Sequence, residues 1–579
     1  MYAQPPMGSY SQSPRYTTGY PMAQPMMAAP MGGSFIAAPV QMAPYVAQAP
    51  APTAAEEEPA KPVSGKDEKG SKTETYDTID LEEAIDMVGV GTSTYVVYII
   101  VGLFTAADSV EVAFISYVTT WLEKPWHLTE SDKALMESMV FAGQIIGAPI
   151  WGMLADKKGR RPVFLVSAAL ITTFGYLTAL APDKTVLTCI RFVVGFGVAG
   201  LSVPFDIFAE MLPSQARGKY LMATFFWFAI GSFYTTFAAW LTLEQYGWQV
   251  FTCMAALPTT IATIAGIFLL PESAHWLASE HRQEEAAETM NTVAKRNGSK
   301  YRFKKCTVPP VLENLGTKDL LTHSKLRKPF FSMALVWLGF GVAFYGISLL
   351  MPHMFHDEGG GIDDGNCTAQ FNSTLREKLL PAKFTYRPLT TRDIATNGTK
   401  IECEDEPQVS FDFQALLLPN FGQAFGLLCG LLLIDTAGRK LVQQVSYGLS
   451  ALFTIFLGFP SLGQGTLSVM SSLALMAQMS ASCCTWTHTP ELFPTKVRGV
   501  ANAILNSFAR LGAFLSPFII SDAIFHDAFT RAAIMAGFSL LGAIAVSFVK
   551  ETSGSTHLDD EDVESSFEEG EEEASESEN

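Results

Sequence analysis

Long apolar runs separated by short polar turns fill the chain between about residue 90 and residue 550. Most of these runs are long enough to cross a bilayer as one α-helix, which takes about 20 residues. We predict twelve spans: 94–122, 134–155, 162–181, 185–209, 219–242, 247–270, 329–352, 412–434, 441–461, 465–489, 499–522 and 530–550. The pattern predicts an all-α membrane protein with twelve transmembrane helices.

A charged turn, GMLADKKGRR at Gly152–Arg161, lies between the second and third spans and returns as IDTAGRK with Asp435. Asp435 follows Asp156 by 279 residues. Two other segment pairs repeat at nearly the same distance. EMLPSQARG answers ELFPTKVRG, 281 residues apart, and the glutamate of PES answers that of KET, 279 apart. The chain therefore contains two copies of one membrane unit, as in many transporters that bind solute between their halves.

These segments, together with RFVVGFGVAG around Arg191, resemble the signatures of the major facilitator superfamily over roughly residues 90 to 552. That resemblance implies two pseudo-symmetric six-helix bundles. More narrowly, ADSVEV (107–112), FYGISLLMP (344–352) and a loop with Asn-x-Thr sites resemble the synaptic vesicle glycoprotein 2 and its related proteins.

The resemblance also implies that the charged motif residues form ion-pair clusters at the cytosolic face, which act as a gate. Two glycines allow the tight turn and close helix approach. The predicted gate residues are Gly152, Asp156, Gly159, Arg160, Arg161, Glu210, Arg217, Asp435, Gly438, Arg439, Glu491 and Arg498.

Positive charge sets the expected orientation. The short loops after the even-numbered spans hold most of the loop Lys and Arg, so both termini should be cytosolic. The membrane is then a plasma membrane or an endomembrane vesicle. The long loop between the seventh and eighth spans should face the lumen or exterior. It carries three glycosylation sequons, Asn366, Asn372 and Asn397, and two cysteines, Cys367 and Cys403, that an oxidising compartment would allow to pair.

Composition adds the ends of the chain to this picture. The chain has 48% hydrophobic residues and a net charge of −18, much of it in an acidic tail that should be solvated and could bind trafficking partners. The predicted organisation is a disordered low-complexity N-terminus (1–75), a membrane-surface helix (76–93), an N-terminal bundle (94–270), a cytosolic linker with a surface helix (271–328), a C-terminal bundle (329–550) with an insert (353–410), and a disordered acidic tail (551–579).

Charges inside apolar spans are costly and are therefore functional candidates. Asp108 and Glu111 lie three residues apart in the first span, on one helix face. Mutual repulsion and burial would favour a bound proton, as proton-coupled transport requires. The alternative is a fixed ion pair, with Arg510 as the first choice of partner and Arg191 as the second.

Arg510 could instead bind an anionic solute directly through its planar fork. Other polar or aromatic residues in the spans are either cavity-lining or packing residues. They are Gln144, Asp206, Trp227, Tyr345, Asn420, Gln423 and His488. For Asp206 the reading as part of the network around Glu210 and Arg217 is favoured over a cavity role.

The sequence thus predicts an alternating-access carrier of a small organic solute, proton-linked and similar to synaptic vesicle 2-related transporters. A sugar porter and an organic-cation carrier stay open. A receptor or trafficking scaffold is the alternative of another class, although a scaffold needs no gate. No phosphate loop, metal cluster or nucleophile arrangement supports an enzyme. We expect no cofactor, no bound metal and no nucleic-acid partner.

Overall fold

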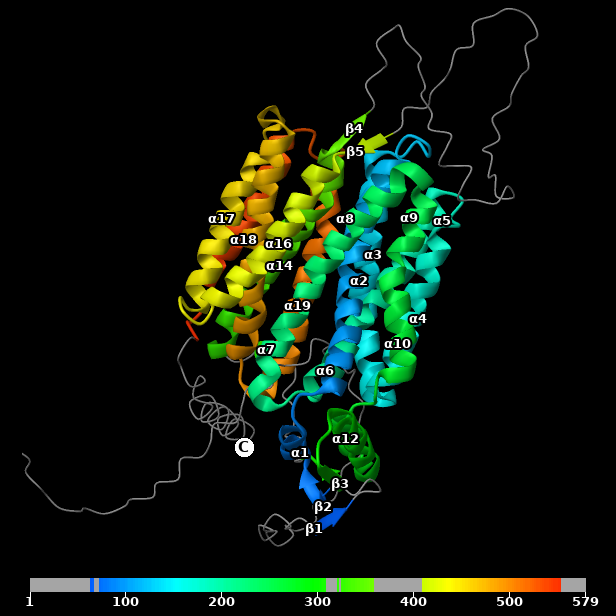
Figure 1. Cartoon of the computed structure of the whole chain (residues 1–579). Helices are drawn as coiled ribbons and strands as arrows, with labels where there is room; N and C mark the ends of the chain where they lie inside the picture. The colour runs from blue at the N-terminus through cyan, green and yellow to red at the C-terminus, as the bar shows by residue number, and fades with distance from the viewer. Residues whose placement is uncertain (1–62, 67–71, 309–319, 322–323, 359–408, 553–579) are drawn as a thin grey trace, which may run out of the picture.

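The computed structural model describes residues 63–66, 72–308, 320–321, 324–358 and 409–552. Figure 1 shows two helical bundles side by side, with a small mixed subdomain beneath the N-terminal one. Many large apolar side chains on the outer helix faces are exposed, among them Phe268 at 75% and Leu432 at 65%. Such a continuous apolar surface is expected where helices face lipid.

The N-terminal bundle is built from one long helix pair followed by helices that are interrupted. Its elements are α2 (Thr92–Leu122), α3 (Glu130–Lys158), α4 (Arg160–Thr178), α5 (Lys184–Val198) with η1 (Ala199–Leu201) and α6 (Ser202–Glu210), α7 (Ser214–Thr224) with α8 (Phe226–Tyr246), and α9 (Trp248–Ala255) with α10 (Leu257–Leu269).

The C-terminal bundle repeats the arrangement with fewer breaks. Its elements are α14 (Ser324–Met354), α16 (Phe413–Leu433), α17 (Arg439–Phe456), η2 (Pro460–Leu462), α18 (Gln464–Glu491), α19 (Thr495–Ile520) and α20 (Ala528–Val546). Across the two bundles, α2 contacts α14, α3 contacts α19 and α8 contacts α16.

The twelve-span prediction is confirmed in substance. Among the described residues, eleven helical segments are long and apolar enough to cross a membrane. The twelfth predicted span is α17, which has 18 residues and buries a polar stripe including Gln443, Ser446 and Ser450. Its contacts with α18 and α20 place it within the bundle.

Two of the helix breaks in the N-terminal bundle coincide with prolines. Pro204 follows η1 near the start of α6, and Pro258 stands in the first turn of α10. Proline has no backbone N–H and cannot continue the hydrogen-bond ladder of the preceding turn. A close approach also depends on glycine: a Cβ on Gly195 would lie 1.9 Å from the carbonyl oxygen of Val140, so α5 can pack directly on α3.

The subdomain joins the segment before the first span to the linker between the bundles. Strand β2 (Lys72–Asp80) pairs antiparallel with β1 (Val63–Lys66) and parallel with β3 (Tyr301–Thr307). Three helices complete it: α1 (Leu81–Val88), α11 (Ala274–Ser279) and α12 (Gln283–Asn297). Its core includes Trp276, Leu277 and Met290, and the predicted linker surface helix is α12.

Two expectations for this region are wrong. Residues 63–66 and 72–75, predicted to be disordered, form strands of the sheet. The amphipathic segment predicted on the membrane surface is α1, and its apolar face packs on α12 and β3 instead. Leu81 is 1% and Ile85 3% exposed, so that face is already covered by protein. The rest of 1–75, like the tail from 553 onward, lies outside the described residues.

The two ends of the bundles differ, and we name them by their contents. The motif end carries the tight turns at Gly159 and Gly438, next to the subdomain. The insert end carries the short sheet of β4 (His356–Glu358) and β5 (Val409–Phe411), visible at the top of Figure 1. Between these strands, residues 359–408 lie outside the described part. The predicted glycosylation sites Asn366, Asn372 and Asn397 and the cysteines Cys367 and Cys403 fall there.

Candidate functional site

A cavity with about 1230 Å³ of unfilled space lies between the two bundles, from the middle of the molecule toward the motif end. Aromatic rings form much of its wall, and polar side chains gather at its deepest part. The lining residues that matter below are Asp108, Gln144, Phe225, Phe228, Phe344, Tyr345, Trp486, Asn502, Asn506 and Arg510. They come from α2, α3, α7, α8, α14, α18 and α19, so both halves build the site.

Asp108 and Arg510 face each other across the boundary between the halves. Arg510 Nη2 lies 3.4 Å from Asp108 Oδ2, and Arg510 Nη1 donates to Gln144 Oε1 at 2.7 Å and to the Tyr345 hydroxyl at 3.1 Å. Gln144 Nε2 in turn donates to Asp108 Oδ1 at 3.2 Å. Asp108 is 5% exposed and the Arg510 side chain 21%. This is an ion pair in the cavity wall that couples α2 to α19.

Glu111 points elsewhere, into the N-terminal bundle. Its Oε2 accepts from Arg191 Nη1 at 2.6 Å, and both side chains are at most 5% exposed. Arg191 also donates to the Thr178 hydroxyl and lies over the Phe114 ring, 5.2 Å from its centroid. The pair is desolvated on all sides, where charges need each other as counterions.

The structure therefore separates the two carboxylates that the sequence puts on one helix face. Each has its own arginine: Arg510 from the other bundle for Asp108, and Arg191 from the same bundle for Glu111. Of the two predicted partners, Arg510 was expected first for either carboxylate. A residue spacing of three corresponds to about 300° around the helix, which leaves enough divergence for the side chains to enter different surroundings.

The other predicted lining residues divide into three groups. Gln144 and Tyr345 line the main cavity, whereas Asn420 and Gln423 line a smaller one of about 440 Å³ nearer the insert end. There Asn420 Nδ2 donates to the Thr236 hydroxyl at 2.8 Å. Trp227 packs on Gly102 and on the Tyr98 ring, outside both sets of lining residues.

The remaining two are packing residues of the spans. Asp206 is buried in α6 and is not among the lining residues of either cavity. His488 is fully buried and lies between the Gln443 amide, 3.1 Å away, and the Lys550 carbonyl oxygen, 2.9 Å away. It therefore links α18 to α17 and to the end of the C-terminal bundle.

At the motif end, the N-terminal gate cluster is centred on the turn at Gly159. Arg160 reaches Glu210 at 3.4 Å and Asp156 at 3.5 Å, while its backbone N–H donates to Glu272 Oε1 at 2.9 Å. The Arg161 N–H donates to the same oxygen at 3.0 Å. Glu272 was recognised only as part of the repeat, yet its carboxylate caps α4.

The C-terminal cluster repeats these contacts. Arg439 reaches Asp435 at 3.1 Å and Glu491 at 3.2 Å, and Glu551 accepts from the backbone N–H groups of Arg439 and Lys440 at 2.9 Å each. The clusters thus hold helices together within each half.

Arg217 departs from the predicted cluster around Glu210. It donates to Glu82 of α1 at 2.9 Å, and so ties the bundle to the subdomain. Its counterpart Arg498 donates to the Phe493 carbonyl oxygen at 3.2 Å. Gly152 is buried in the last two turns of α3.

At the insert end, hydrogen bonds join the halves directly. Ser116 donates to the Leu349 carbonyl oxygen at 2.5 Å and Ser138 to that of Phe514 at 3.0 Å. His353 of α14 lies 2.9 Å from Glu137 of α3. Sequence reasoning missed Glu137 and His353. Glu137 is a charge inside the predicted span 134–155, which is the signal that could have found it.

Comparison with known proteins places this geometry in a family. The family model described as "Sugar (and other) transporter" matches residues 86–357 and 420–562, more than half of the chain. The chain belongs to this family of membrane transporters. The resemblance to the major facilitator superfamily and to the synaptic vesicle 2-related proteins is thereby confirmed.

Relatives of the sugar (and other) transporter family cover most of the chain. The synaptic vesicle 2-related protein of Rattus norvegicus is 26% identical over 83% of this chain and 82% of its own. The protein of the same name from Xenopus laevis gives the same identity and coverage. Among solved structures, the partially occluded inward open conformation of the xylose transporter XylE from E. coli aligns at a TM-score of 0.57 and 18% identity, over 80% of this chain and 99% of XylE. That likeness concerns the fold.

Proposed function

We propose that this member of the family is a secondary active transporter that moves a small organic solute by alternating access, coupled to protons. The observation that carries the proposal is the Asp108–Arg510 ion pair, which spans the two bundles at the deepest part of a cavity that both bundles line. A solute or a proton that binds there changes an interaction between the halves, and this is how a ligand can bias one orientation over another.

The arrangement corresponds to a carrier open toward its motif end. The main cavity extends toward that end, whereas Ser116, Ser138 and His353 close the insert end by contacts between the halves. Given the distribution of Lys and Arg, we propose that the motif end is cytosolic and the glycosylation sites are luminal or extracellular. Rocking to the opposite state would break the insert-end contacts.

Protonation of Asp108 would remove its attraction for Arg510 and free the guanidinium for solute or water. We assign the coupling role to this pair. Glu111 and Arg191, buried 2.6 Å apart within one bundle, would hold α2 against α5 while the neighbouring pair changes state. This retains both carboxylates as candidates and gives them different tasks.

The cavity wall favours a solute with an apolar or aromatic body and a few polar groups. Phe225, Phe228, Phe344 and Trp486 supply flat apolar surface, and Asn502, Asn506 and Gln144 supply amide donors and acceptors. The amides would also suit the hydroxyl groups of a sugar, so a sugar porter is the second candidate. An organic cation could occupy the same aromatic wall.

Uptake into proteoliposomes under an imposed pH gradient tests the proposal, with a panel of radiolabelled sugars, aromatic organic cations and organic anions. We expect gradient-driven accumulation of one class. We expect Asp108→Asn to reduce this accumulation at least about tenfold while solute exchange at equal pH continues, because the variant mimics the protonated carboxyl. Glu111→Gln should reduce accumulation and exchange together.

Glu288→Gln is the matched control, since Glu288 is exposed on α12, remote from the cavity. It should transport like the wild type. Accumulation that survives intact in both Asp108→Asn and Glu111→Gln would remove the carboxylates from the coupling mechanism. A purified, folded protein that transports no member of the panel under any gradient would favour the receptor or scaffold alternative.

A further inference from the structure

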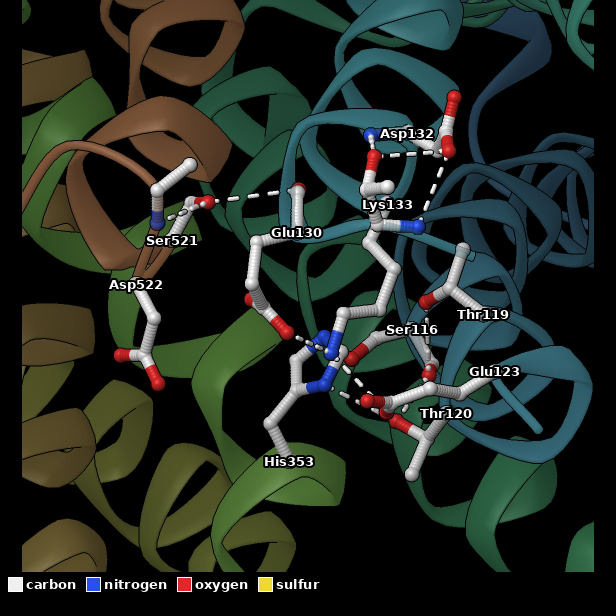
Figure 2. Close-up of polar contacts among 12 residues, drawn as sticks. Ser116, Thr119, Thr120, Glu123, Glu130, Asp132, Lys133, His353, Ser521 and Asp522 are labelled. Carbon is white, nitrogen blue, oxygen red and sulfur yellow. Dashed lines mark hydrogen bonds and ion pairs between the residues drawn. The ribbon is translucent and has the colours of Figure 1, made fainter. Parts of the chain in front are cut away.

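A second buried polar cluster lies at the insert end, away from the cavity. In Figure 2, His353 extends from α14 toward α2 and α3, close to Thr120. Its Nε2 is 2.9 Å from Glu137 Oε1 and its Nδ1 is 3.0 Å from the Thr120 hydroxyl oxygen. Both partners belong to the N-terminal bundle and His353 to the C-terminal one. Each ring nitrogen of this histidine therefore bridges the two halves.

Hydrogen-bond accounting indicates which form of the ring fits this site. The Thr120 hydroxyl lies 2.8 Å from the Ser116 carbonyl oxygen, which can only accept its hydrogen. The hydroxyl oxygen is then an acceptor toward Nδ1. Glu137 accepts from the Thr119 hydroxyl at 2.7 Å on the same oxygen that faces Nε2. Both ring nitrogens face acceptors, and only the imidazolium donates from both.

Glu137 is the acidic partner of this site. Its side chain is 2% exposed, and a carboxylate removed from water needs a counter-charge and hydrogen-bond donors. Thr119 supplies one donor, and protonated His353, with a side chain 17% exposed, supplies the other together with the charge. The pair can form only while α14 lies against α2 and α3.

The other charged groups around the site are mostly paired with one another. Lys133, one turn before Glu137 on α3, bonds Glu123 at 2.9 Å as well as Glu130. Asp132 bonds Lys184 at 2.6 Å, and Asp522 pairs with Arg531. On the neighbouring sheet and α8, His356 begins β4, and Glu244 accepts from the Phe411 N–H. Figure 2 shows the Lys133 group beside His353.

We propose that His353 and Glu137 form a second proton-binding site, whose occupancy from the insert side holds the insert end of the carrier closed. Imidazole is the side chain that gains or loses a proton between about pH 5 and pH 8. A proton taken from water on the insert side converts His353 to the imidazolium, which then donates to Glu137 and Thr120. When the proton leaves, the charge attraction is lost and one ring nitrogen can no longer donate.

Because the bridging geometry exists only in the closed state, proton binding and closure favour each other by linkage. The inference rests on the proposed alternating access, but not on the coupling role of Asp108. Its sign is defined: lowering the pH stabilises the closed insert end, and raising the pH through the imidazole titration releases it.

Distance measurements by pulsed electron spin resonance test the site without any solute. Spin labels at Leu180→Cys, past the end of α4, and at Leu462→Cys, between α17 and α18, report the separation of the bundles at the insert end, in a background lacking the eight native cysteines. In the wild-type background we expect the ratio of short to long distances to fall by about tenfold between pH 5.5 and pH 8.

The variants separate charge from shape. His353→Gln should give one distance distribution at both pH values, and His353→Lys should stay in the short-distance state because its cation does not titrate in this range. Glu137→Gln should lose most of the pH response and serves if a His353 variant does not fold. His526→Gln is the matched control, an exposed histidine at the same end, and should respond like the wild type.

A pH response that persists in both His353→Gln and Glu137→Gln, or its absence in the wild type, would overturn the site. Asp108→Asn distinguishes this outcome from a failure of the proposed transport function. If the distances in Asp108→Asn still respond to pH while its uptake is lost, the insert-end site acts independently of the central pair. If the response disappears in Asp108→Asn alone, the proton acts at the cavity.

Discussion

The two gate clusters at the motif end use the same parts in the same places. Around Gly159 and around Gly438, an arginine reaches a glutamate on the fourth helix of its bundle, and a second glutamate accepts from two backbone N–H groups at a helix start. Even the hydroxyl contacts repeat, from Ser273 to Glu210 and from Thr552 to Glu491. The ends of the bundles have therefore retained one solution to capping charged helix termini.

The membrane interiors of the two halves have diverged. The first helix of the N-terminal bundle carries Asp108 and Glu111, while α14, its counterpart, has no charged residue between Pro329 and Pro352. Only the N-terminal interior contains a buried pair such as Glu111–Arg191 among the described residues. Gating thus needs both copies of the turn, whereas the charge chemistry has been placed mainly in one half.

The subdomain adds a second asymmetry. Glu82 reaches Arg217, and Asp86 accepts from the Ser214 backbone N–H at 2.9 Å at the start of α7. The Asn297 side chain accepts from the Ser93 N–H at 2.8 Å and donates to the Gly89 carbonyl oxygen at 3.0 Å. The N-terminal bundle is consequently fastened to the linker at two helix starts, and this difference between the halves can be tested.

The largest expected effect concerns Cys306, which is fully buried in β3. Burial raises the pKa of its thiol from 9.0 to about 12, with the nearby Asp80 adding to the shift. Because the thiolate is the reactive form, maleimide labelling of the docked subdomain below pH 9 should be roughly a thousandfold slower than that of an unfolded thiol. Labelling monitored by mass spectrometry checks this. Fast labelling of the native protein would mean that the subdomain is not held against the bundle.

Next comes the buried pair that distinguishes the two interiors. Arg191→Met should destabilise the protein by about 3–5 kcal/mol, because it leaves the Glu111 carboxylate buried without its counterion. The double variant with Glu111→Gln should recover much of this loss. Thermal unfolding in detergent, followed by tryptophan fluorescence, measures both. A comparable loss from Gln478→Met in α18 would show that the two interiors are less different than their charges suggest.

The glycine turns test the similarity of the two ends. Gly159 has φ 96° and Gly438 φ 87°, and a Cβ at either would come within 2.8 Å of the capping glutamate. Gly159→Ala and Gly438→Ala should each cost about 1–3 kcal/mol through backbone strain and crowding of the carboxylate. Equal losses in the same unfolding assay would support equivalent roles. A loss at only one turn would break the symmetry.

The smallest effect is expected for the tie between α1 and the bundle. Glu82 is one-third exposed, so Glu82→Gln should cost about 1 kcal/mol or less, since water screens the pair with Arg217. The sharper readout is the Cys306 labelling rate, which should rise as the subdomain opens more often. Glu285→Gln on the exposed face of α12 is the control and should leave that rate unchanged.

Much of the fold could be predicted because its signals are local or periodic. The spans, the repeat offset near 280 and the turns at Gly159 and Gly438 follow from hydrophobic runs and from residues with restricted roles. The linker helix was also predicted. The three-stranded sheet could not be, because β2 and β3 are separated by more than 200 residues and parallel pairing leaves no turn signal between them.

The site was predicted in its members more than in its connections. Asp108, Arg510, Gln144 and Tyr345 were all candidates, and the structure brings them together. Glu111 was grouped with Asp108 because spacing along one helix says nothing about which neighbouring helix each side chain meets. Glu137 and His353 were missed because their significance arises only from the contact between α3 and α14.

The sequence by itself determined that this chain is a membrane protein made of two related halves, since bilayer insertion and helix formation depend on the apolar character and order of nearby residues. The tertiary structure alone decided which charges are partners: Glu111 with Arg191 inside one bundle, and Asp108 with Arg510 and Glu137 with His353 between the two. Electrostatic pairing acts over a few ångströms in space. Such proximity between distant segments exists only once the bundles have packed.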